Sequence, residues 1–272
     1  MKLLTRFDER VDSLAFVPTM GALHAGHLAL IKKAQTLGAN VLVSIYVNPT
    51  QFESFDDLAR YPKTLDRDLE LAEQAGANFV WTPTVDEIYP EGIAQVAMIP
   101  AGPIGDRYEG VARPNHFSGV LTVINRLFTI TEPQFAIFGE KDYQQLFLIR
   151  RFANEKFPAI DIVAGATVRD SHGIALSSRN SRLSPQEMVI ARVFPQAAEL
   201  AKEIHSVSTL KMRIEQLFAS QSGFTPDYVE VVDPESLLPA PDDFHGVVRV
   251  LMAGWIGSVR LIDNFSHLVK GR

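Results

Sequence analysis

Hydrophobic and polar positions follow two different periods along the first two thirds of the chain. Short apolar runs of strand length alternate with longer segments in which apolar residues recur every three or four positions, as on one helix face. The strand-like runs cover 14–17, 40–47, 78–83, 134–139 and 160–168, and the helix-like segments cover 27–38, 64–76, 118–130 and 142–153. Strand–helix alternation with short connections is typical of βαβ units, so we predict an α/β fold with a doubly wound parallel sheet.

The pattern changes near residue 180. Ser184, Pro185 and Glu187 have the spacing of a helix capping box, and Pro195 is expected to kink or end the helix that they start. The later segments are one helix over 210–219 and strands over 227–233, 245–254 and 258–264. Helices followed by strands predict a smaller C-terminal α+β domain. A polar stretch separates the two parts, so we expect domains at 1–178 and 179–272.

The composition restricts the protein classes that remain. The chain has 272 residues, of which 46% are hydrophobic and 21% charged, as is typical of a soluble globular protein. A net charge of −6 disfavours a general nucleic-acid binder, and the absence of cysteine excludes disulfides, zinc–thiolate sites and thiol nucleophiles. The sequence contains neither a signal-peptide pattern nor an apolar run of membrane-spanning length. We therefore expect a cytoplasmic protein that binds neither nucleic acid nor membrane.

The stretch PTMGALHAGH follows the first strand directly and opens the first helix. Gly21 and Gly26 allow a ligand to approach the backbone closely, and His24 and His27 are three residues apart, on one side of a helical turn. A helix N-terminus at the carboxyl end of a parallel strand attracts phosphate, so we predict phosphate contact by both histidines. A metal-binding pair and two packed structural histidines are the alternatives. The stretch is neither a dinucleotide fingerprint nor a P-loop, and neither motif occurs elsewhere in the chain.

A second candidate, FGEKDYQQL, follows the strand over 134–139 and precedes a helix. Lys141 is a mobile positive charge suited to phosphate, and Asp142 could bind a ribose hydroxyl or cap the helix. The amides of Gln144 and Gln145 both donate and accept hydrogen bonds, which suits a hydroxyl or a carboxylate. Taken alone, this stretch is equally compatible with an ordinary charged helix start.

Three shorter stretches add polar groups. The serines and Arg179 of GIALSSRN would form a phosphate clamp or an ordinary interdomain linker. In YVNPTQF, Asn48 and Gln51 are neutral polar groups at a strand end, where turn chemistry is the alternative. Asp66 and Asp68 lie at a helix start and would either bind magnesium held mainly by phosphate or form a solvated acidic first turn.

Together these stretches resemble the pantothenate synthetase family, also called pantoate–β-alanine ligases, within the His-x-Gly-His nucleotidylyltransferase superfamily. The matching motifs occur in order and are PTMGALHAGH, VNPTQF, YPKT, RPNHFSGVLTVINRLF, FGEKDYQQL, TVRD, SSRN and YVEVVDPESL. The resemblance implies a Rossmann-like N-terminal domain, a smaller C-terminal domain that closes over the site, and a homodimer. It also implies the ATP-dependent joining of pantoate to β-alanine through a pantoyl adenylate, with AMP and pyrophosphate as products.

The resemblance, together with the residue chemistry, assigns roles to individual positions. The expected ATP-binding residues are Met20, Gly21, Ala22, Leu23, His24, Ala25, Gly26, His27, Gly139, Glu140, Lys141, Asp142, Val168, Leu176, Ser177, Ser178 and Arg179. The expected substrate-binding residues are Asn48, Gln51 and Gln145, and the expected metal ligand is Asp68, for Mg²⁺. The expected catalytic residues are His24, His27, Lys141 and Arg179, with His27 as the proton donor.

Three other functions remain as alternatives at this point. A different nucleotidylyltransferase would share His-x-Gly-His but would stop after one nucleotidyl transfer. A non-catalytic nucleotide-binding protein would bind ATP without turnover. A fragment of an aminoacyl-tRNA synthetase would need to bind RNA, for which the net negative charge is poorly suited.

Overall fold

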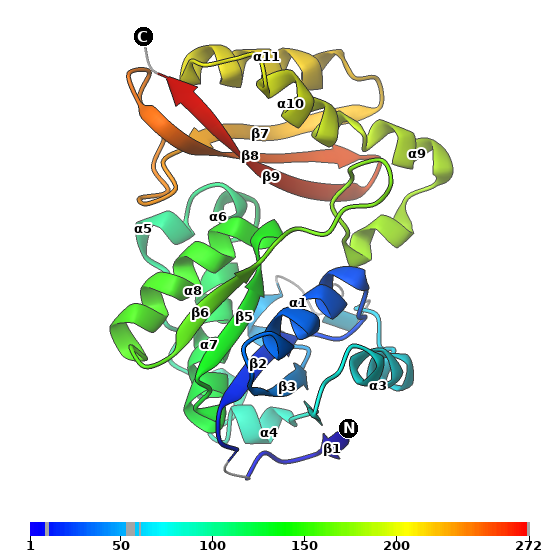
Figure 1. The fold of residues 1–272 in the computed structure, drawn as a ribbon, viewed down its shortest axis with the longest axis vertical. Helices are drawn as coiled ribbons and strands as arrows, with labels where there is room; N and C mark the ends of the chain where they lie inside the picture. Colours follow the sequence, from blue (N-terminus) through cyan, green and yellow to red (C-terminus); the bar gives the residue numbers. More distant parts are fainter. Residues whose placement is uncertain (9–10, 53–57, 60, 271–272) are drawn as a thin grey trace. The chain divides into compact units, whose positions relative to one another are not determined.

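The computed structural model describes residues 1–8, 11–52, 58–59 and 61–270. The chain forms two compact units, Met1–Ala166 and Thr167–Arg272 (Figure 1). This division lies earlier in the chain than the boundary expected after residue 178. The reason is local, because the segment after Ala166 bonds to the C-terminal unit, through Arg169 to Asp263. The domain functions expected from the sequence remain predictions.

The N-terminal unit contains a parallel six-stranded sheet in the order β1-β4-β3-β2-β5-β6. Its strands are β1 (Lys2–Leu4), β2 (Leu14–Thr19), β3 (Asn40–Ile45), β4 (Phe79–Trp81), β5 (Phe135–Gly139) and β6 (Asp161–Gly165). From β2 the chain builds outward on one side through β3 and β4, and then returns to build β5 and β6 on the other. The predicted doubly wound α/β sheet is therefore confirmed, with its switch point between β2 and β5.

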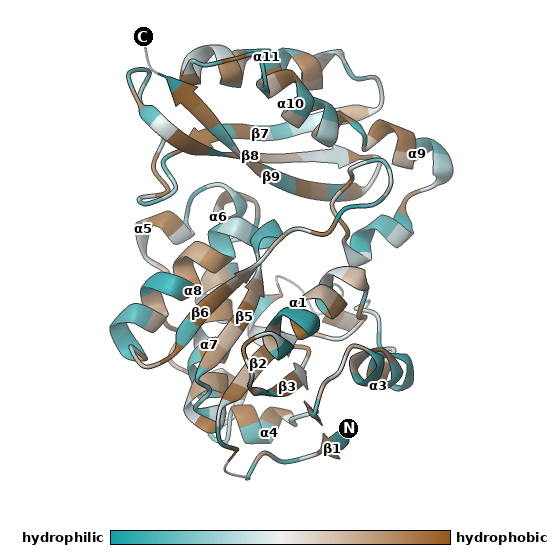
Figure 2. Cartoon of the chain, viewed as in Figure 1, coloured by the Kyte–Doolittle hydropathy of each residue, from teal (hydrophilic) through white to brown (hydrophobic). Residues whose placement is uncertain are grey.

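Helices cover both faces of this sheet. The helices of the unit are α1 (Ala25–Gln35), α3 (Leu65–Gln74), α4 (Val85–Ile88), α5 (Gly102–Gly105), α6 (Glu109–Ala112), α7 (His116–Thr131) and α8 (Tyr143–Lys156), with 3-10 turns η1 (Pro49–Gln51), η2 (Ile93–Gln95) and η3 (Glu140–Asp142). On one face, Ile31 and Ala34 of α1 and Ala72 of α3 pack against Val17 and Val43. Figure 2 shows the resulting pattern, with hydrophobic strands and a largely hydrophilic α3.

The first strand was expected to end at residue 17, before Pro18, but β2 continues through Pro18 to Thr19. The pairing of β2 with β5 ends at Phe16, so the missing N–H of Pro18 falls where β2 no longer pairs with β5. On the other side of β2, the pairing with β3 continues to Thr19 and Ile45. The sheet therefore carries the chain two residues further, to the loop that holds the histidines.

The C-terminal unit is a small α+β domain, as predicted. Its antiparallel sheet has the order β7-β8-β9, and the elements are β7 (Phe224–Val232), β8 (His245–Ile256), β9 (Val259–Lys270), α9 (Pro185–Ile190), α10 (Val193–Ala201), α11 (Val207–Ser220) and η4 (Ser178–Arg182). The Ser184–Glu187 capping box forms, and the helix ends before Pro195, which lies in the first turn of α10. Phe194, Phe218 and Phe224 form edge-to-face contacts in the core.

No helix within the described residues has the length and apolar character needed to cross a membrane.

Candidate active site

Three neighbouring strands of the N-terminal unit end in the polar segments that the sequence singled out. β2 leads into the loop before α1, β3 leads into the turn η1, and β5 leads into η3 at the start of α8. Because all three strands are parallel, their carboxyl ends lie at one edge of the sheet, on both sides of the switch point. The sheet topology therefore gathers the expected site residues of this unit into one region.

A buried carboxylate shapes the loop after β2. Gly21 and Ala22 have positive φ angles of 82° and 52°, a conformation that favours glycine and strains alanine. The carboxylate of Asp68 accepts hydrogen bonds from the backbone N–H groups of Ala22 at 2.9 Å and Leu23 at 2.7 Å, and also from the Thr64 hydroxyl at 3.1 Å. Asp68 is 1% exposed, and both of its oxygens bind protein groups. This arrangement supports Asp68 as a loop-shaping residue in place of the expected metal ligand.

The two histidines form a reciprocal cap at the start of α1. His24 Nδ1 accepts from the N–H of Gly26 at 3.1 Å, and His27 Nδ1 accepts from the N–H of His24 at 3.3 Å. Their ring centroids lie 4.2 Å apart. A nitrogen that accepts a backbone N–H carries no proton, so each neutral ring holds its proton on Nε2. Within the described residues neither Nε2 binds a protein group, and both can donate to a ligand.

Both imidazoles are held in the neutral form. Burial, followed by the nearby His24 ring, lowers the pKa of His27 to about 3. Burial and the Lys141 ammonium lower the pKa of His24. Neutral rings with Nε2–H groups can donate hydrogen bonds to phosphate oxygens, but they hold no extra proton to release near pH 7. The neutral Nε2–H of His27 therefore supports hydrogen-bond donation to phosphate, and the proton-donor role implied by the resemblance stays a prediction.

The glycine of the motif has a direct steric role. A Cβ on Gly26 would lie 2.8 Å from Cε1 of His24, closer than a side-chain contact allows. The N–H groups of Gly21, Ala22, Leu23, His24 and Gly26 all bind acceptors within the protein. Most of the loop N–H groups are thus already used, which makes the histidine rings the main donors that the loop offers to an anion.

We expect the buried histidines to make the protein less stable in acid. His27 and His116 have folded-state pKa values of about 3 and about 4, against the ordinary histidine value of 6.5. As the pH falls below about 6.5, the unfolded chain takes up protons that the folded chain cannot, so each residue removes up to about 1.4 kcal/mol of stability per pH unit. Urea unfolding at pH 7.5, 6.0 and 5.0 tests this.

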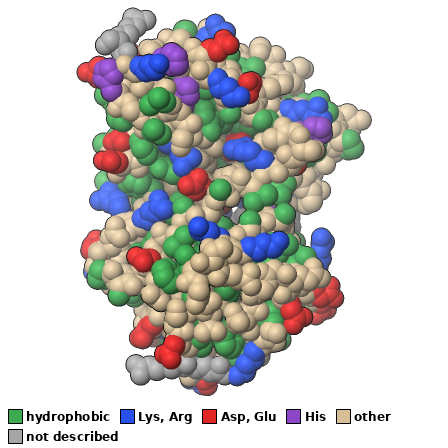
Figure 3. All heavy atoms as spheres, in the orientation of Figure 1, with side chains coloured by type: hydrophobic (Ala, Val, Ile, Leu, Met, Phe, Trp, Pro, Cys, Tyr) green, Lys and Arg blue, Asp and Glu red, His purple; other side chains and the backbone are tan. Residues whose placement is uncertain are grey.

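The matched control for that series is a surface histidine. Histidines also lie on the surface of the C-terminal unit (Figure 3), and His245 is one that is exposed. Replacing His116 with asparagine should flatten the slope between pH 6.5 and 5.0, whereas His245→Gln should leave it unchanged. Equal unfolding free energies at pH 7.5 and 5.0 in the wild type would contradict the burial argument.

Lys141 joins the second candidate stretch to the histidines. Its charge lowers the pKa of both His24 and His27, while the charge of Asp142 raises both, so these two side chains lie within electrostatic range of the imidazoles. The Lys141 ammonium is 3.5 Å from the Asp142 carboxylate, and its side chain is 18% exposed. The ends of β2 and β5 thus place two neutral donors and one positive charge together, as an ATP phosphate chain would require.

The adjacent glutamines at the start of α8 have different environments. Gln144 is buried; its amide donates to the carbonyls of Ile104 and Arg107 at 2.7 and 2.8 Å and accepts from the N–H of Glu109 at 3.0 Å. It therefore fixes the α5–α6 turns, and both of its N–H donors are used within the protein. Gln145 is partly exposed, and within the described residues its side chain makes no hydrogen bond. Of the two amides, Gln145 is the one available to a substrate.

The turn after β3 contains an asparagine whose side-chain hydrogen bonds are all made within the protein, and a glutamine that the asparagine holds in place. Asn48 is 1% exposed; it donates to Gln51 Oε1 at 3.0 Å and to the Gly119 carbonyl at 3.2 Å, and it accepts from the Tyr89 hydroxyl at 2.8 Å. These contacts support a turn-forming role for Asn48 over the direct substrate contact that was expected. The amide nitrogen of Gln51 lies 3.1 Å from the sulfur of Met20, in the stretch expected to bind ATP.

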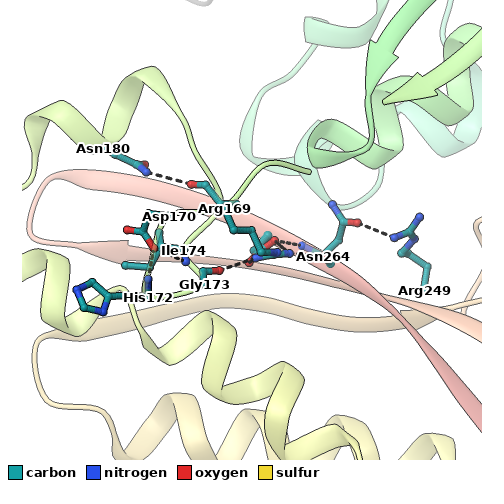
Figure 4. A network of polar contacts seen from close by, with 10 residues as sticks. Arg169, Asp170, His172, Gly173, Ile174, Asn180, Arg249 and Asn264 are labelled. Carbon is teal, nitrogen blue, oxygen red and sulfur yellow. Dashed lines mark hydrogen bonds and ion pairs between the residues drawn. The ribbon is translucent and has the colours of Figure 1, made fainter. Parts of the chain in front are cut away.

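Gly139 ends β5 and Glu140 begins η3, whereas the other five expected ATP-binding residues lie in the C-terminal unit, on the segment drawn in Figure 4. Arg169 forms a bidentate ion pair with Asp263 of β9, at 2.6 and 2.9 Å, and also donates to the carbonyl of Gly173. Asn180 donates to the carbonyl of Ala175 at 3.0 Å. The segment that bears Val168, Leu176, Ser177, Ser178 and Arg179 is therefore attached to β9 at its start. Ser177 caps η4 by accepting from the N–H of Arg179.

Sequence reasoning gave no role to two residues near the site. His116 is buried and lies 3.0 Å from the carbonyl oxygen of Gln51 through Nδ1, and 3.1 Å from the Arg113 guanidinium through Nε2. Both residues belong to the stretch RPNHF, which served at the sequence level only as part of a motif that carries the resemblance. Without the fold, nothing indicated that this stretch lies beside the end of β3.

Comparison with known proteins identifies the family. The sequence model of the family described as pantoate–β-alanine ligase matches residues 2–266. The chain belongs to the pantoate–β-alanine ligase family. It is 45% identical to a pantothenate synthetase of Rhizorhabdus wittichii over 259 residues, which cover 93% of this chain and 90% of the relative.

Solved structures of pantoate–β-alanine ligases have the same fold. A pantothenate synthetase from Thermus thermophilus has a TM-score of 0.90 at 40% identity, with 97% of this chain and 99% of that chain covered. A pantoate–β-alanine ligase from Francisella tularensis, complexed with a form of ATP and β-alanine, has a TM-score of 0.78 at 34% identity, with 97% of each chain covered. The match to the family includes both compact units and every motif described above.

Proposed function

We propose that this chain joins pantoate to β-alanine in an ATP-dependent reaction that forms pantothenate, AMP and pyrophosphate, the final step in making that vitamin. The observation that carries the proposal is the donor set at the switch point, in a chain of this family. His24 and His27 present neutral Nε2–H groups, and the Lys141 ammonium lies within electrostatic range of both rings. A site of this kind stabilises negative charge that develops on phosphate.

In the first step, the pantoate carboxylate attacks the α-phosphorus of ATP, and pyrophosphate leaves with the electrons of the broken P–O bond. The protein supplies no covalent nucleophile in this proposal; it positions the two substrates and stabilises charge on the phosphates. Lys141 neutralises charge, while the histidine rings donate hydrogen bonds. In the C-terminal unit, Arg179 is suited to bidentate phosphate binding, with Ser177 and Ser178 as further donors.

In the second step, the β-alanine amine attacks the carbonyl carbon of pantoyl adenylate. The amide bond forms, the amine loses a proton, and AMP leaves. Gln145 and Gln51 hold the pantoate part in this proposal; they lie in the first turns after β5 and β3, on the same edge of the sheet as the histidines and Lys141. Adenylates hydrolyse readily, so a site that excludes water until β-alanine binds would protect the intermediate.

Magnesium is proposed to enter with ATP, held mainly by the phosphates. Among the described residues, no group of three histidine, aspartate or glutamate side chains is placed to hold a metal ion. The carboxylate of Asp68 is already bonded to the loop, so the residues present do not form a protein-based magnesium site there. We assign no step of the reaction to the metal. We also propose that the protein is a homodimer and is located in the cytoplasm.

Pyrophosphate release tests the function directly. The protein is incubated with ATP, magnesium and pantoate, with and without β-alanine. Sustained turnover that needs both substrates, with AMP and pantothenate as products, is the expected result. If pyrophosphate release did not depend on pantoate, the ATP site would stand but the substrate would be a different one, as in a different nucleotidylyltransferase. ATP binding without turnover would identify a non-catalytic nucleotide-binding protein.

We expect Gln145→Ala to raise the KM for pantoate by about tenfold with little change in the KM for ATP, because one substrate hydrogen bond is worth about 1 kcal/mol or more. The adjacent Gln144 provides the control. Gln144→Leu should lower the unfolding free energy, since three backbone groups lose their partner, without a selective effect on pantoate. An effect of Gln145→Ala confined to ATP would overturn its assignment.

A further inference from the structure

The stretch RPNHFSGV contains the start of α7 and contacts the turn after β3. A Cβ on Gly119 would lie 2.3 Å from the carbonyl oxygen of Thr50 and 2.9 Å from Cα of Gln51, so α7 packs directly against the backbone of this turn. The Gly119 carbonyl accepts from the Asn48 amide at 3.2 Å. The N-terminal turn of α7 thus packs directly against the residues that precede Gln51.

His116 bonds to Gln51 itself, and its two ring nitrogens have different roles. A guanidinium only donates, so Nε2 accepts from Arg113 at 3.1 Å. A backbone carbonyl only accepts, so Nδ1 carries the proton and donates to the oxygen of Gln51 at 3.0 Å. Both partners require the same neutral tautomer, and burial together with the Arg113 charge supports it by lowering the pKa of His116 to about 4.

The side chain of Gln51 is oriented from the opposite direction. Its Oε1 accepts from the Asn48 amide at 3.0 Å, and its Nε2 faces the Met20 sulfur at 3.1 Å. Gln51 is 9% exposed, so little freedom remains for the amide to rotate. The hydrogen bond from His116, with a longer one from the Arg113 guanidinium at 3.4 Å, fixes the backbone end of the residue, and Asn48 fixes the amide end.

We propose that His116 is a positioning residue for pantoate binding, which acts by holding the carbonyl of Gln51 so that the Gln51 amide faces the substrate. This inference rests on the proposed function, in which Gln51 binds pantoate. Arg113 supports His116 by fixing its tautomer. The ring itself is not assigned any contact with substrate, so its effect should appear through Gln51 and should be specific for pantoate.

The test compares two replacements of His116 in the full-length protein. Phenylalanine keeps a buried ring but removes the donor, whereas asparagine places an N–H near the position of Nδ1. We expect His116→Phe to raise the KM for pantoate about tenfold, with the KM for ATP unchanged, and His116→Asn to restore most of the affinity. Thr122→Val is the matched control, since Thr122 is a buried polar residue of α7 that bonds to the Ser118 carbonyl and the Ile99 N–H.

A double-mutant cycle with Gln51→Ala decides whether His116 acts through Gln51. The expected result is that His116→Phe adds little to the pantoate KM once the Gln51 side chain is absent. The proposal would be overturned if the two substitutions multiplied each other's effect on the pantoate KM, or if the KM for ATP rose equally. It would also be overturned if Thr122→Val gave the same rise, or if His116→Asn gave no recovery. An unchanged pantoate KM in Gln51→Ala would overturn it as well. Pantothenate formation by the wild type in the same assay separates that outcome from a failure of the proposed function.

Discussion

Replacing Lys141 with alanine is expected to slow pantoyl adenylate formation by about a hundredfold or more, the size of effect seen when a single group that stabilises transition-state charge is removed. Lys141 is mostly buried, and its charge reaches both histidine rings. Its loss removes the positive charge proposed to neutralise the phosphates as pyrophosphate leaves. Single-turnover measurement of adenylate formation, with enzyme in excess over ATP, isolates this step from product release.

Lys156 is the matched control for that experiment. It is a lysine at the far end of the helix that follows Lys141, with a 60% exposed side chain paired with Glu155. Lys156→Ala should leave the single-turnover rate and the unfolding free energy close to the wild-type values. A Lys141→Ala rate equal to that of the wild type would mean that Lys141 does not stabilise the transferring phosphate.

Replacing Asp68 with asparagine is expected to lower the unfolding free energy by about 2–4 kcal/mol, because a buried carboxylate that accepts three hydrogen bonds becomes an amide with one acceptor. The amide NH₂ would face a backbone N–H of Ala22 or Leu23, so the loop must move. Since this loop leads into the cap at His24, we also expect ATP to bind at least tenfold more weakly. Urea unfolding and ATP titration measure the two effects.

Asp66 provides the comparison, because it lies in the same first turn of α3 with an exposed side chain. Asp66→Asn should have little effect on either measurement. The same pair separates loop shaping from metal binding. If Asp68 were mainly a magnesium ligand, Asp68→Asn would raise the magnesium concentration needed for activity and leave the unfolding free energy unchanged. That result would reverse our assignment.

The periodicity of the sequence was sufficient for the fold, because the βαβ pattern and the turn signals agree along most of the chain. The expected strands and the longer helices all form, and the capping box at Ser184 is present. The short elements were missed. α5 and α6 have four residues each and depend on Gln144, which is more than 30 positions away, so no local pattern could reveal them.

The sequence was sufficient to pick out the motifs of the candidate site, but not the hydrogen bonds that each side chain makes. Spacing placed His24 and His27 at a helix start, but only the fold shows which ring nitrogen each one uses for the backbone. Asp68 bonds to residues 45 and 46 positions away, which a sequence read as a helix start cannot indicate. Likewise, Gln144 and Gln145 are the same residue type, and their different environments follow from which side of α8 faces the α5–α6 turns.

The reciprocal histidine cap ties local folding and ligand binding to the same side chains. In each ring Nδ1 caps the start of α1, and Nε2 remains for the proposed hydrogen bond to phosphate. An alanine at either position would therefore remove a helix cap and a ligand donor together, and its kinetic defect would mix the two losses. Asparagine can keep the cap while giving up the outward donor. Comparing His24→Asn with His24→Ala would thus divide the total defect into its structural and catalytic shares.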